Sequence, residues 1–375
     1  MEVRQKVLGY ACFLLMLFWQ VNSTADDFDE TINDQIDAVK ATPGRQTGNF
    51  ITVPIPLSNP TLGTGLQLAL LYLHPQQPGK EDIPNSTSGL GAMYTDSDSR
   101  VLGAFHDDYL LQDRLRLKLA VASAELNVDY FGSGQFPALA ENPIEYNLDT
   151  DLVYGQVLYR IPATNNWFGG LRAAWMSSSV KFNQQLNNRP LPDLANKIDV
   201  VNFALVANYD DTNDNYYPTS GKWFEAILAR DDQSWGSSFN FDRYTASYNQ
   251  YFPVRSSSVI AFRTWASEVR GNAPFFLLPA LDMRGFASGR YQDNAAISAH
   301  IEWREKFSQR WGFIASVESG RVADSFNDLG NGESVNSIGA GIRWQVSSDQ
   351  SMHLGLDVGY SEGETAVYLR IGEKF

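Results

Sequence analysis

Hydrophobic and polar residues alternate along most of this chain with a period of two. In residues 115–121, Leu115, Leu117, Leu119 and Val121 share one side of the pattern, and the positions between them include two basic residues. The same alternation recurs in residues 298–305, 338–346, 353–360 and 366–375. Successive side chains of a β-strand point to opposite faces, whereas an α-helix repeats about every 3.6 residues. The pattern therefore predicts strands with one apolar and one polar face.

Two kinds of soluble protein, the β-sandwich and the solenoid, also contain alternating strands, so other features must decide. Tryptophan and tyrosine, present 9 and 17 times, gather toward the ends of the predicted strands, as in the aromatic girdles of membrane barrels. Connections are short, as in 347–351, or long and polar, as in 74–89 and 182–197, which fits periplasmic turns and outer loops. The chain also ends on Phe375, on the apolar face of the last predicted strand. No repeat of about 20 to 50 residues supports a solenoid.

The length of the alternating region sets the size of the predicted barrel. Roughly 330 residues follow Gly48, and about 20 residues per strand with its share of loop give about 16 strands. An even number is typical of bacterial single-chain barrels. We therefore predict an all-β fold, a transmembrane antiparallel β-barrel of about 16 strands that covers residues 48–375.

The first 25 residues are predicted to be a secretory signal peptide. Arg4 and Lys6 precede an apolar run of about 13 residues, which is shorter than the roughly 20 residues that span a bilayer. The single cysteine, Cys12, lies within this run, so residues 26–375 contain no thiol and no disulfide. We expect an exported protein that resides in a Gram-negative outer membrane.

Residues 26–47 are acidic and polar, and we expect them to form a short periplasmic lead-in. The whole chain has a formal net charge of −14, and residues 1–25 carry Glu2, Arg4 and Lys6, a net +1, so the remainder has −14 − 1 = −15. Such a charge argues against nucleic acid or an anionic membrane surface as a partner.

Several stretches match recurring family motifs in the family's order. They are DMRGFASGRY at 282–291, the hairpin sequence at 208–228, SVESGRVAD at 316–324, SIGAGIRW at 337–344, VYLRIGEKF at 367–375 and the opening stretch at 54–70. Together they resemble the bacterial surface antigen superfamily of outer-membrane barrels, which includes the barrel-assembly insertase and the two-partner secretion transporters. Each motif alone is weak, and their shared order is what identifies the chain as a member.

This resemblance implies that the loop around Arg284 folds back from the outer surface into the lumen, where the arginine pairs with carboxylates of the inner wall. Independently, the period of two places Glu302, Glu318, Asp357 and Arg343 on inward-facing positions. A guanidinium in a partly dehydrated lumen is stable only when carboxylates satisfy it, and it then holds its loop firmly. We therefore predict a lumen-inserted loop locked by Arg284; an ordinary turn with a surface arginine is the alternative.

Neighbouring residues have predicted roles in the same loop and in the last strand. Gly285 allows a tight turn of the backbone, and Phe286 packs against the wall. Tyr368 and Phe375 resemble the closing-strand signal of the family, which implies recognition by the barrel-assembly machinery during biogenesis.

The sequence also departs from the family pattern. Glu318 stands where the family has Asp, Ser316 where it usually has Phe or Gly, and Asn213 where it has Arg. Relatives that handle client proteins carry periplasmic POTRA domains of about 75 residues. Only the short lead-in precedes the predicted barrel, so we expect a form without POTRA domains.

The candidate chemistry of the chain is sparse. It has four histidines and none of the nucleophile, metalloprotease or phosphate-binding motifs. His300 and Glu302, on one inward face, are the best acid–base candidates, yet polar pairs are the normal lining of a water-filled lumen. We predict no catalytic site, no cofactor and no enzymatic activity.

An acidic group in the hairpin sequence is a possible ligand set for Ca²⁺. Asp210, Asp211 and Asp214 offer closely spaced hard oxygens, but the glycine and final glutamate of a calcium loop are missing. The family resemblance explains these residues as hairpin sequence, and we predict no metal site.

The function expected from these patterns is that of a conduit or membrane-insertion barrel, in which a weak seam between the first and last strands passes protein or lipid. A passive pore for small solutes and a non-conducting structural barrel are the alternatives. The expected partners are outer-membrane lipid and a client or periplasmic protein.

Overall fold

The structure is a computed structural model that describes residues 49–75, 86–132, 139, 142–182, 185–186, 189–190, 194–214, 217–345 and 353–375. The predicted signal peptide and the predicted lead-in lie outside these residues. In the described part, no helix is long and apolar enough to cross a membrane.

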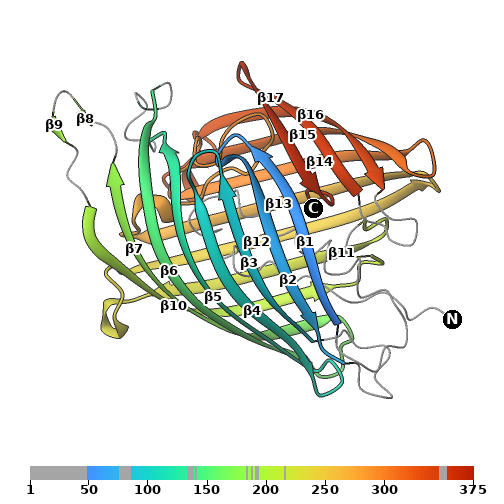
Figure 1. Cartoon of the computed structure of the whole chain (residues 1–375), viewed down its shortest axis with the longest axis horizontal. Coiled ribbons are helices and arrows are strands. Elements are labelled where there is room, and N and C mark those ends of the chain that lie inside the picture. The colour runs from blue at the N-terminus through green and yellow to red at the C-terminus, as the bar shows by residue number, and fades with distance from the viewer. Residues whose placement is uncertain are drawn as a thin grey trace.

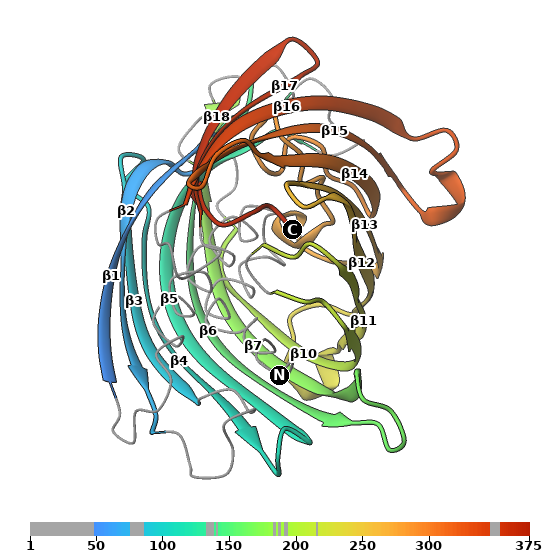
Figure 2. The ribbon, with the colours of Figure 1, turned by 90° about the vertical axis from the view of Figure 1, so that its right-hand side faces the viewer.

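Sixteen antiparallel strands form a closed barrel, which confirms the predicted fold (Figures 1 and 2). They are β1 (Asn49–Asn59), β2 (Gly63–Leu73), β3 (Thr87–Thr95), β4 (Arg100–Leu110), β5 (Leu115–Tyr130), β6 (Ile144–Arg160), β7 (Trp167–Phe182), β10 (Leu194–Asp210), β11 (Gly221–Asp231), β12 (Phe241–Arg255), β13 (Ser258–Gly271), β14 (Ala295–Lys306), β15 (Trp311–Ala323), β16 (Glu333–Gln345), β17 (His353–Ser361) and β18 (Glu364–Ile371). Two short strands, β8 (Gln185–Leu186) and β9 (Arg189–Pro190), form a separate hairpin between β7 and β10.

The alternation in the sequence corresponds to the two faces of the barrel wall. On β5, Leu119 and Val121 are 46% and 50% exposed, while Lys118, the residue before Leu119, is 4% exposed. On β14, Ile301 is 53% exposed and Glu302 is fully buried. The apolar side chains thus face outward, where a bilayer covers them, and the polar ones face the lumen.

The two ends of the barrel differ in the elements they hold. β1 begins and β18 ends at one end, which we call the terminal end; the opposite end, which holds the β13–β14 connection, is the loop end. Because every strand pair is antiparallel, the β2–β3 and β16–β17 connections both lie at the terminal end. The expectation that 74–89 is an outer loop, opposite in kind to 347–351, is therefore wrong.

The last strand ends earlier than the sequence predicts. β18 stops at Ile371; Gly372 adopts φ of +89° and donates its N–H to the oxygen of His353 at 2.8 Å. The chain then turns into the lumen, and Figure 2 shows the C-terminus inside the barrel. Phe375 is 5% exposed inside the barrel. The prediction that Phe375 completes the apolar face of the last strand is therefore wrong.

The inner wall has two chemically different halves. On β2 to β7 its inward side chains are largely apolar and buried, including Leu71, Phe105, Leu126, Leu148 and Val180. On β14 to β18 they include many charged and equally buried side chains, among them Glu302, Glu318, Arg343, Asp357 and Arg370. The candidate functional site lies between these halves.

Candidate functional site: the loop across the lumen

The β13–β14 connection, residues 272–294, crosses the lumen from one half of the wall to the other. Near its start, the ring of Phe275 packs against Tyr130, Tyr146 and Phe182 at centroid distances of 4.5, 5.2 and 5.9 Å. Phe276, 1% exposed, belongs to the same apolar cluster as the β2–β7 wall. The early part of the loop is thus anchored by apolar packing.

Arg284, further along the loop, reaches the charged half of the wall and is fully buried. Its Nη2 donates to Glu302 Oε2 at 2.5 Å, its Nη1 to Glu318 Oε1 at 2.5 Å, and its Nε to Asp357 Oδ2 at 3.1 Å. Nη1 also donates to Ser316 Oγ at 3.2 Å. One guanidinium therefore joins β14, β15 and β17 to the loop.

Glu318 takes two bonds from Arg284, because its other oxygen, Oε2, accepts the main-chain N–H of Arg284 at 2.7 Å. The longer side chain that distinguishes this chain from the family pattern reaches both the guanidinium and the backbone of the loop. Ser316, the second departure, donates to Glu318 Oε1 at 3.3 Å. The two departures therefore contact one another in the same network.

Further basic side chains pair with the same carboxylates. Arg304 Nε donates to Glu302 Oε1 at 2.8 Å, and Arg343 bonds Asp357 and also donates to Glu373 Oε2 at 2.8 Å. Burial by itself would lower the pKa of Arg284, but the neighbouring carboxylates, Glu302 foremost, outweigh it and hold this pKa above its usual range. Fully buried charges are tolerated here because each faces partners of opposite sign.

The tip of the loop fits because glycines leave it room. Gly285 has φ of +107°, a region that favours glycine. A Cβ on Gly359 of β17 would lie 2.5 Å from both Arg284 Cβ and the nitrogen of Gly285. A Cβ on Gly339 of β16 would lie 2.7 Å from Arg284 Cδ. The inward glycines of β16 and β17 thus form the recess that the loop occupies, a role that glycine at inward positions of two adjacent strands could have indicated.

Tyr368 and Phe286 hold the tip from two sides. The hydroxyl of Tyr368 accepts the N–H of Gly285 at 3.0 Å and donates to the oxygen of Phe286 at 3.2 Å. The ring of Phe286, 4% exposed, packs with Leu281, Met283 and the ring of Tyr291. Tyr368 was expected as part of a strand signal, and the structure places its side chain against the loop.

The inward-turned tail, residues 372–375, belongs to the same network, and sequence reasoning did not find it. Lys374 Nζ lies 3.2 Å from Asp282 Oδ1 and 3.9 Å from Glu318 Oε2. Arg304 donates to the main-chain oxygen of Phe375, whose ring packs 5.8 Å from that of His300. The tail therefore covers the network at the terminal end.

The two other candidate sites from the sequence are the pair of His300 with Glu302 and the carboxylates of the hairpin. His300 lies 3.5 Å from Glu318 and shares a 3.1 Å hydrogen bond with Ser298, whereas Glu302 is engaged by two arginines. The candidate acid–base pair of His300 and Glu302 therefore has separate partners. In the hairpin, Asp210 accepts from Thr212.

The other hairpin carboxylates also serve the turn. Asp211 accepts from Lys222 and Tyr209, and Asp214 accepts from the N–H of Tyr217. Across the described residues, no group of three or more acidic, histidine or cysteine side chains is placed to hold a metal ion.

The seam between β1 and β18 is short. Its described register is the pair Ser58 and Leu369, whereas β1 and β2 are in register from Asn49 with Leu73 to Asn59 with Gly63. The last strand leaves the sheet just two residues after Leu369.

Two prolines account for this short seam. The main chain of Thr64 in β2 faces away from β1, because its oxygen accepts the N–H of Asp96 and its N–H donates to the Asp96 carboxylate. Thr64 and its cross-strand partner Ser58 are therefore a non-hydrogen-bonded pair. The N–H and oxygen of Ser58 consequently point toward β18. Pro54 and Pro56 have the same parity, and their missing N–H donors therefore fall on the seam edge. β1 offers β18 no donor at either position.

These features define a class of protein: an outer-membrane β-barrel whose lumen is filled by a loop that is held by a buried charge network. The model of the Omp85 superfamily domain matches residues 85–361, and the chain therefore belongs to the Omp85 superfamily, a family of Gram-negative outer-membrane barrels. This confirms the membership predicted from the loop and strand motifs.

Solved structures show the same fold. BamA from Haemophilus ducreyi lacking POTRA domains 1–3 is 15% identical with a TM-score of 0.59, over 88% of this chain and 70% of that one. CdiB from Escherichia coli is 13% identical with a TM-score of 0.60, over 88% and 63%. CdiB from Acinetobacter baumannii is 11% identical with a TM-score of 0.57, over 87% and 60%. The chain thus spans less than two thirds of either CdiB chain. No curated protein sequence matches this chain.

Proposed function

We propose that this protein is a gated barrel that translocates or inserts protein or lipid, that its route is the seam between β1 and β18, and that the loop held by Arg284 keeps it closed at rest. The observation that carries the proposal is the short seam, in which Pro54 and Pro56 remove two of the donors that β1 would otherwise present to β18. Such a seam opens at a lower cost than the other strand pairs, whose registers are longer, because fewer hydrogen bonds are broken.

The content of the lumen favours this function over a passive solute pore. The loop packs on the apolar half of the wall through Phe275 and on the charged half through Arg284. A diffusion pore needs a continuous polar passage, and an apolar half-wall with a loop across it opposes the entry of ions and water. We infer a low resting conductance.

The partners we propose are outer-membrane lipid together with a client or periplasmic protein. Support comes from the family and from the fold shared with BamA and CdiB, whose chains are longer than the part matched here. An unpaired strand edge, such as the seam edge of β1, can pair with an added strand of another chain.

A reversible cross-link at the seam tests the route. Ser58→Cys with Leu369→Cys joins the hydrogen-bonded pair at the seam, whose expected Cα separation of about 5.5 Å is within disulfide reach. Thr52→Cys with Leu70→Cys is the matched control, because it joins β1 to β2, which stay paired when the seam opens. The only natural cysteine, Cys12, lies within the predicted signal peptide.

Each variant would be expressed in a strain that lacks the protein, and the protein and lipid content of its outer membrane measured. We expect the oxidised seam variant to behave like the deletion and to regain function when reduced, while the control supports normal content in both states. Full function of the oxidised seam variant would rule out the seam as the route. A normal outer membrane in the deletion strain itself would contradict the proposed function.

A further inference from the structure

Polar side chains gather on the outer surface of β2, β3 and β4, near the terminal end of the barrel. Further along these strands the outward positions are apolar, and Leu70, Leu90 and Leu102 are 37%, 55% and 64% exposed. Toward the terminal end, the strands and the residues just beyond them carry His74, Ser86, Ser88, His106 and Asp108, which we call the outer histidine cluster. The cluster lies on the face of the wall that is turned away from the lumen and its loop.

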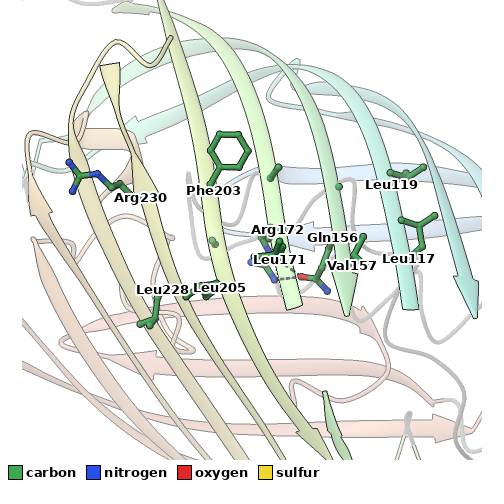
Figure 3. Close-up of a pocket in the computed structure, with 13 residues that line it drawn as sticks. Leu117, Leu119, Gln156, Val157, Leu171, Arg172, Phe203, Leu205, Leu228 and Arg230 are labelled. Atoms are coloured by element: carbon green, nitrogen blue, oxygen red, sulfur yellow. Dashed lines mark hydrogen bonds between the residues drawn. The ribbon is translucent and has the colours of Figure 1, made fainter. Parts of the chain in front are cut away.

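Apolar neighbours bound the outer histidine cluster on both sides. On one side, the cross-strand partner of Ser88 is Tyr72 of β2. On the other side, the partner of His106 is Leu119 of β5, which together with Leu117 lines a mainly apolar hollow on the outer surface (Figure 3). The cluster is therefore a local exception in a surface that the bilayer covers. Ionisable groups on such a surface are costly, and where they occur they usually serve a function.

Two imidazoles of the cluster point at one atom. His74 Nε2 and His106 Nδ1 each lie 2.9 Å from Ser88 Oγ, and the centroids of the two rings are 5.4 Å apart. A hydroxyl donates one hydrogen bond and accepts another, so one of the two facing nitrogens carries a proton and the other a lone pair. When that proton moves to the far nitrogen of its own ring, with no change of charge, two lone pairs converge on the position of the hydroxyl. Converging imidazole nitrogens can chelate a metal ion.

The distances between these groups suit a transition-metal ion. A bond from Zn²⁺ to an imidazole nitrogen is about 2.0 to 2.1 Å long, so each nitrogen would move by roughly 0.8 Å toward an ion at the position of the hydroxyl. His74, Ser88 and His106 are half-buried at the outer surface, where small rotations of their side chains supply this movement. Rotation of the Ser88 side chain to another rotamer vacates the position.

The carboxylate of the cluster favours a cation over an anion. Ser86 joins the carboxylate to the rings, because its hydroxyl donates to Asp108 Oδ1 and its main-chain oxygen accepts the N–H of His74 at 2.9 Å. Asp108 thus places a negative charge beside the converging nitrogens. A divalent cation is attracted by this charge, whereas a phosphate group is repelled by it.

The nitrogen ligands decide which class of cation fits. Ca²⁺ and Mg²⁺ prefer oxygen ligands, whereas Zn²⁺, Ni²⁺ and Cu²⁺ bind imidazole well. We propose that His74 and His106 bind one divalent transition-metal ion of this class, with Asp108 as the nearby counter-charge and water in the remaining positions. The ion would join the end of β2 to β4 across β3. Such a site has two protein ligands, fewer than the groups of three that the described residues lack.

Cu²⁺ is the probe for this site, because it binds nitrogen ligands most tightly among these ions and its electron paramagnetic resonance reports the bound nitrogens. The protein would be purified from the outer membrane in detergent without a polyhistidine tag and titrated with up to one equivalent of Cu²⁺. Electron spin-echo measurements would count the coordinated imidazoles. His74→Ala and His106→Ala each remove one ligand. His353→Ala is the matched control, because His353 is 2% exposed and faces inward on β17.

We expect the wild type and His353→Ala to bind the first equivalent of Cu²⁺ through two imidazoles. In His74→Ala and in His106→Ala the affinity should fall by about tenfold or more, and the signal should show at most one imidazole. Zn²⁺ in about hundredfold excess should displace the copper, and Ca²⁺ in the same excess should not. Thermal unfolding would confirm that each variant is folded. The same signal in all four proteins, a signal altered by His353→Ala alone, or displacement by Ca²⁺ would overturn the proposal.

Discussion

Replacing Arg284 with alanine should release the loop from the lumen while the barrel stays folded. The change removes the shared partner of three buried carboxylates, at 2.5, 2.5 and 3.1 Å. Glu302 keeps Arg304 at 2.8 Å, but Glu318 is left with His300 at 3.5 Å and Lys374 at 3.9 Å. Breaking a buried pair typically costs about 3 to 5 kcal/mol, and the remaining partners favour the lower end. About 3 kcal/mol corresponds to a roughly hundredfold rise in the released population.

Labelling of a single cysteine would measure that population. Ser288 is 8% exposed, and its N–H donates to Thr61 Oγ1 at 2.7 Å, so a cysteine there is protected while the loop is docked. In Ser288→Cys, maleimide labelling should speed up about a hundredfold when Arg284→Ala is added. Planar-bilayer recordings should show a quiet wild type and opening events in Arg284→Ala.

Arg290→Ala is the matched control in the same loop. Arg290 pairs with Glu364 at 2.7 Å, but the two side chains are 18% and 42% exposed, so its loss should cost at most about 1 kcal/mol and speed labelling no more than about fivefold. Equal acceleration by the two substitutions, or unchanged labelling in Arg284→Ala, would refute the view that the buried network holds the loop.

Three further predictions concern the same loop and the seam. Gly359→Ala brings a Cβ to 2.5 Å from Arg284 Cβ, which crowds the docked loop. The rate of maleimide labelling in the Ser288→Cys variant should therefore rise toward the rate measured with Arg284→Ala. Pro54→Val with Pro56→Val restores two donors to the seam edge, and amide exchange in β18 should slow by about 1 to 2 kcal/mol of added protection; unchanged exchange would contradict the proline argument. Burial raises the pKa of Asp293; the hydrogen bond from the Asn294 N–H opposes this shift, and the nearby carboxylate of Asp324 adds to it. The contribution of Asp293 to docking is therefore present below the unfolded-state pKa and lost as pH rises through the folded-state pKa. At neutral pH, adding Asp293→Asn to the Ser288→Cys variant should therefore slow maleimide labelling of the cysteine. The ratio of the two labelling rates, with and without Asp293→Asn, should approach one in acid.

Much of the candidate site could be predicted from local sequence pattern. The two-residue period follows from the backbone of a strand, so it placed Glu302, Glu318 and Asp357 on the inward face without knowledge of their neighbours. The family resemblance supplied the loop of Arg284. The recess formed by Gly339 and Gly359 was missed: inward glycines on adjacent strands can indicate a close approach, but the segment that fills the recess comes from a distant part of the chain, and only the tertiary structure identifies it.

The sequence by itself determined the strands, their two faces and the approximate size of the barrel, because these depend on backbone geometry and on the exclusion of polar groups from the bilayer. Only the tertiary structure decided what meets across the lumen. Phe375 has the parity of an outward residue, yet it lies inside, because β1 with Pro54 and Pro56 offers the end of β18 no donors and the chain leaves the sheet at Gly372. Closure of the barrel brings β1 beside β18, and no local pattern contains that contact.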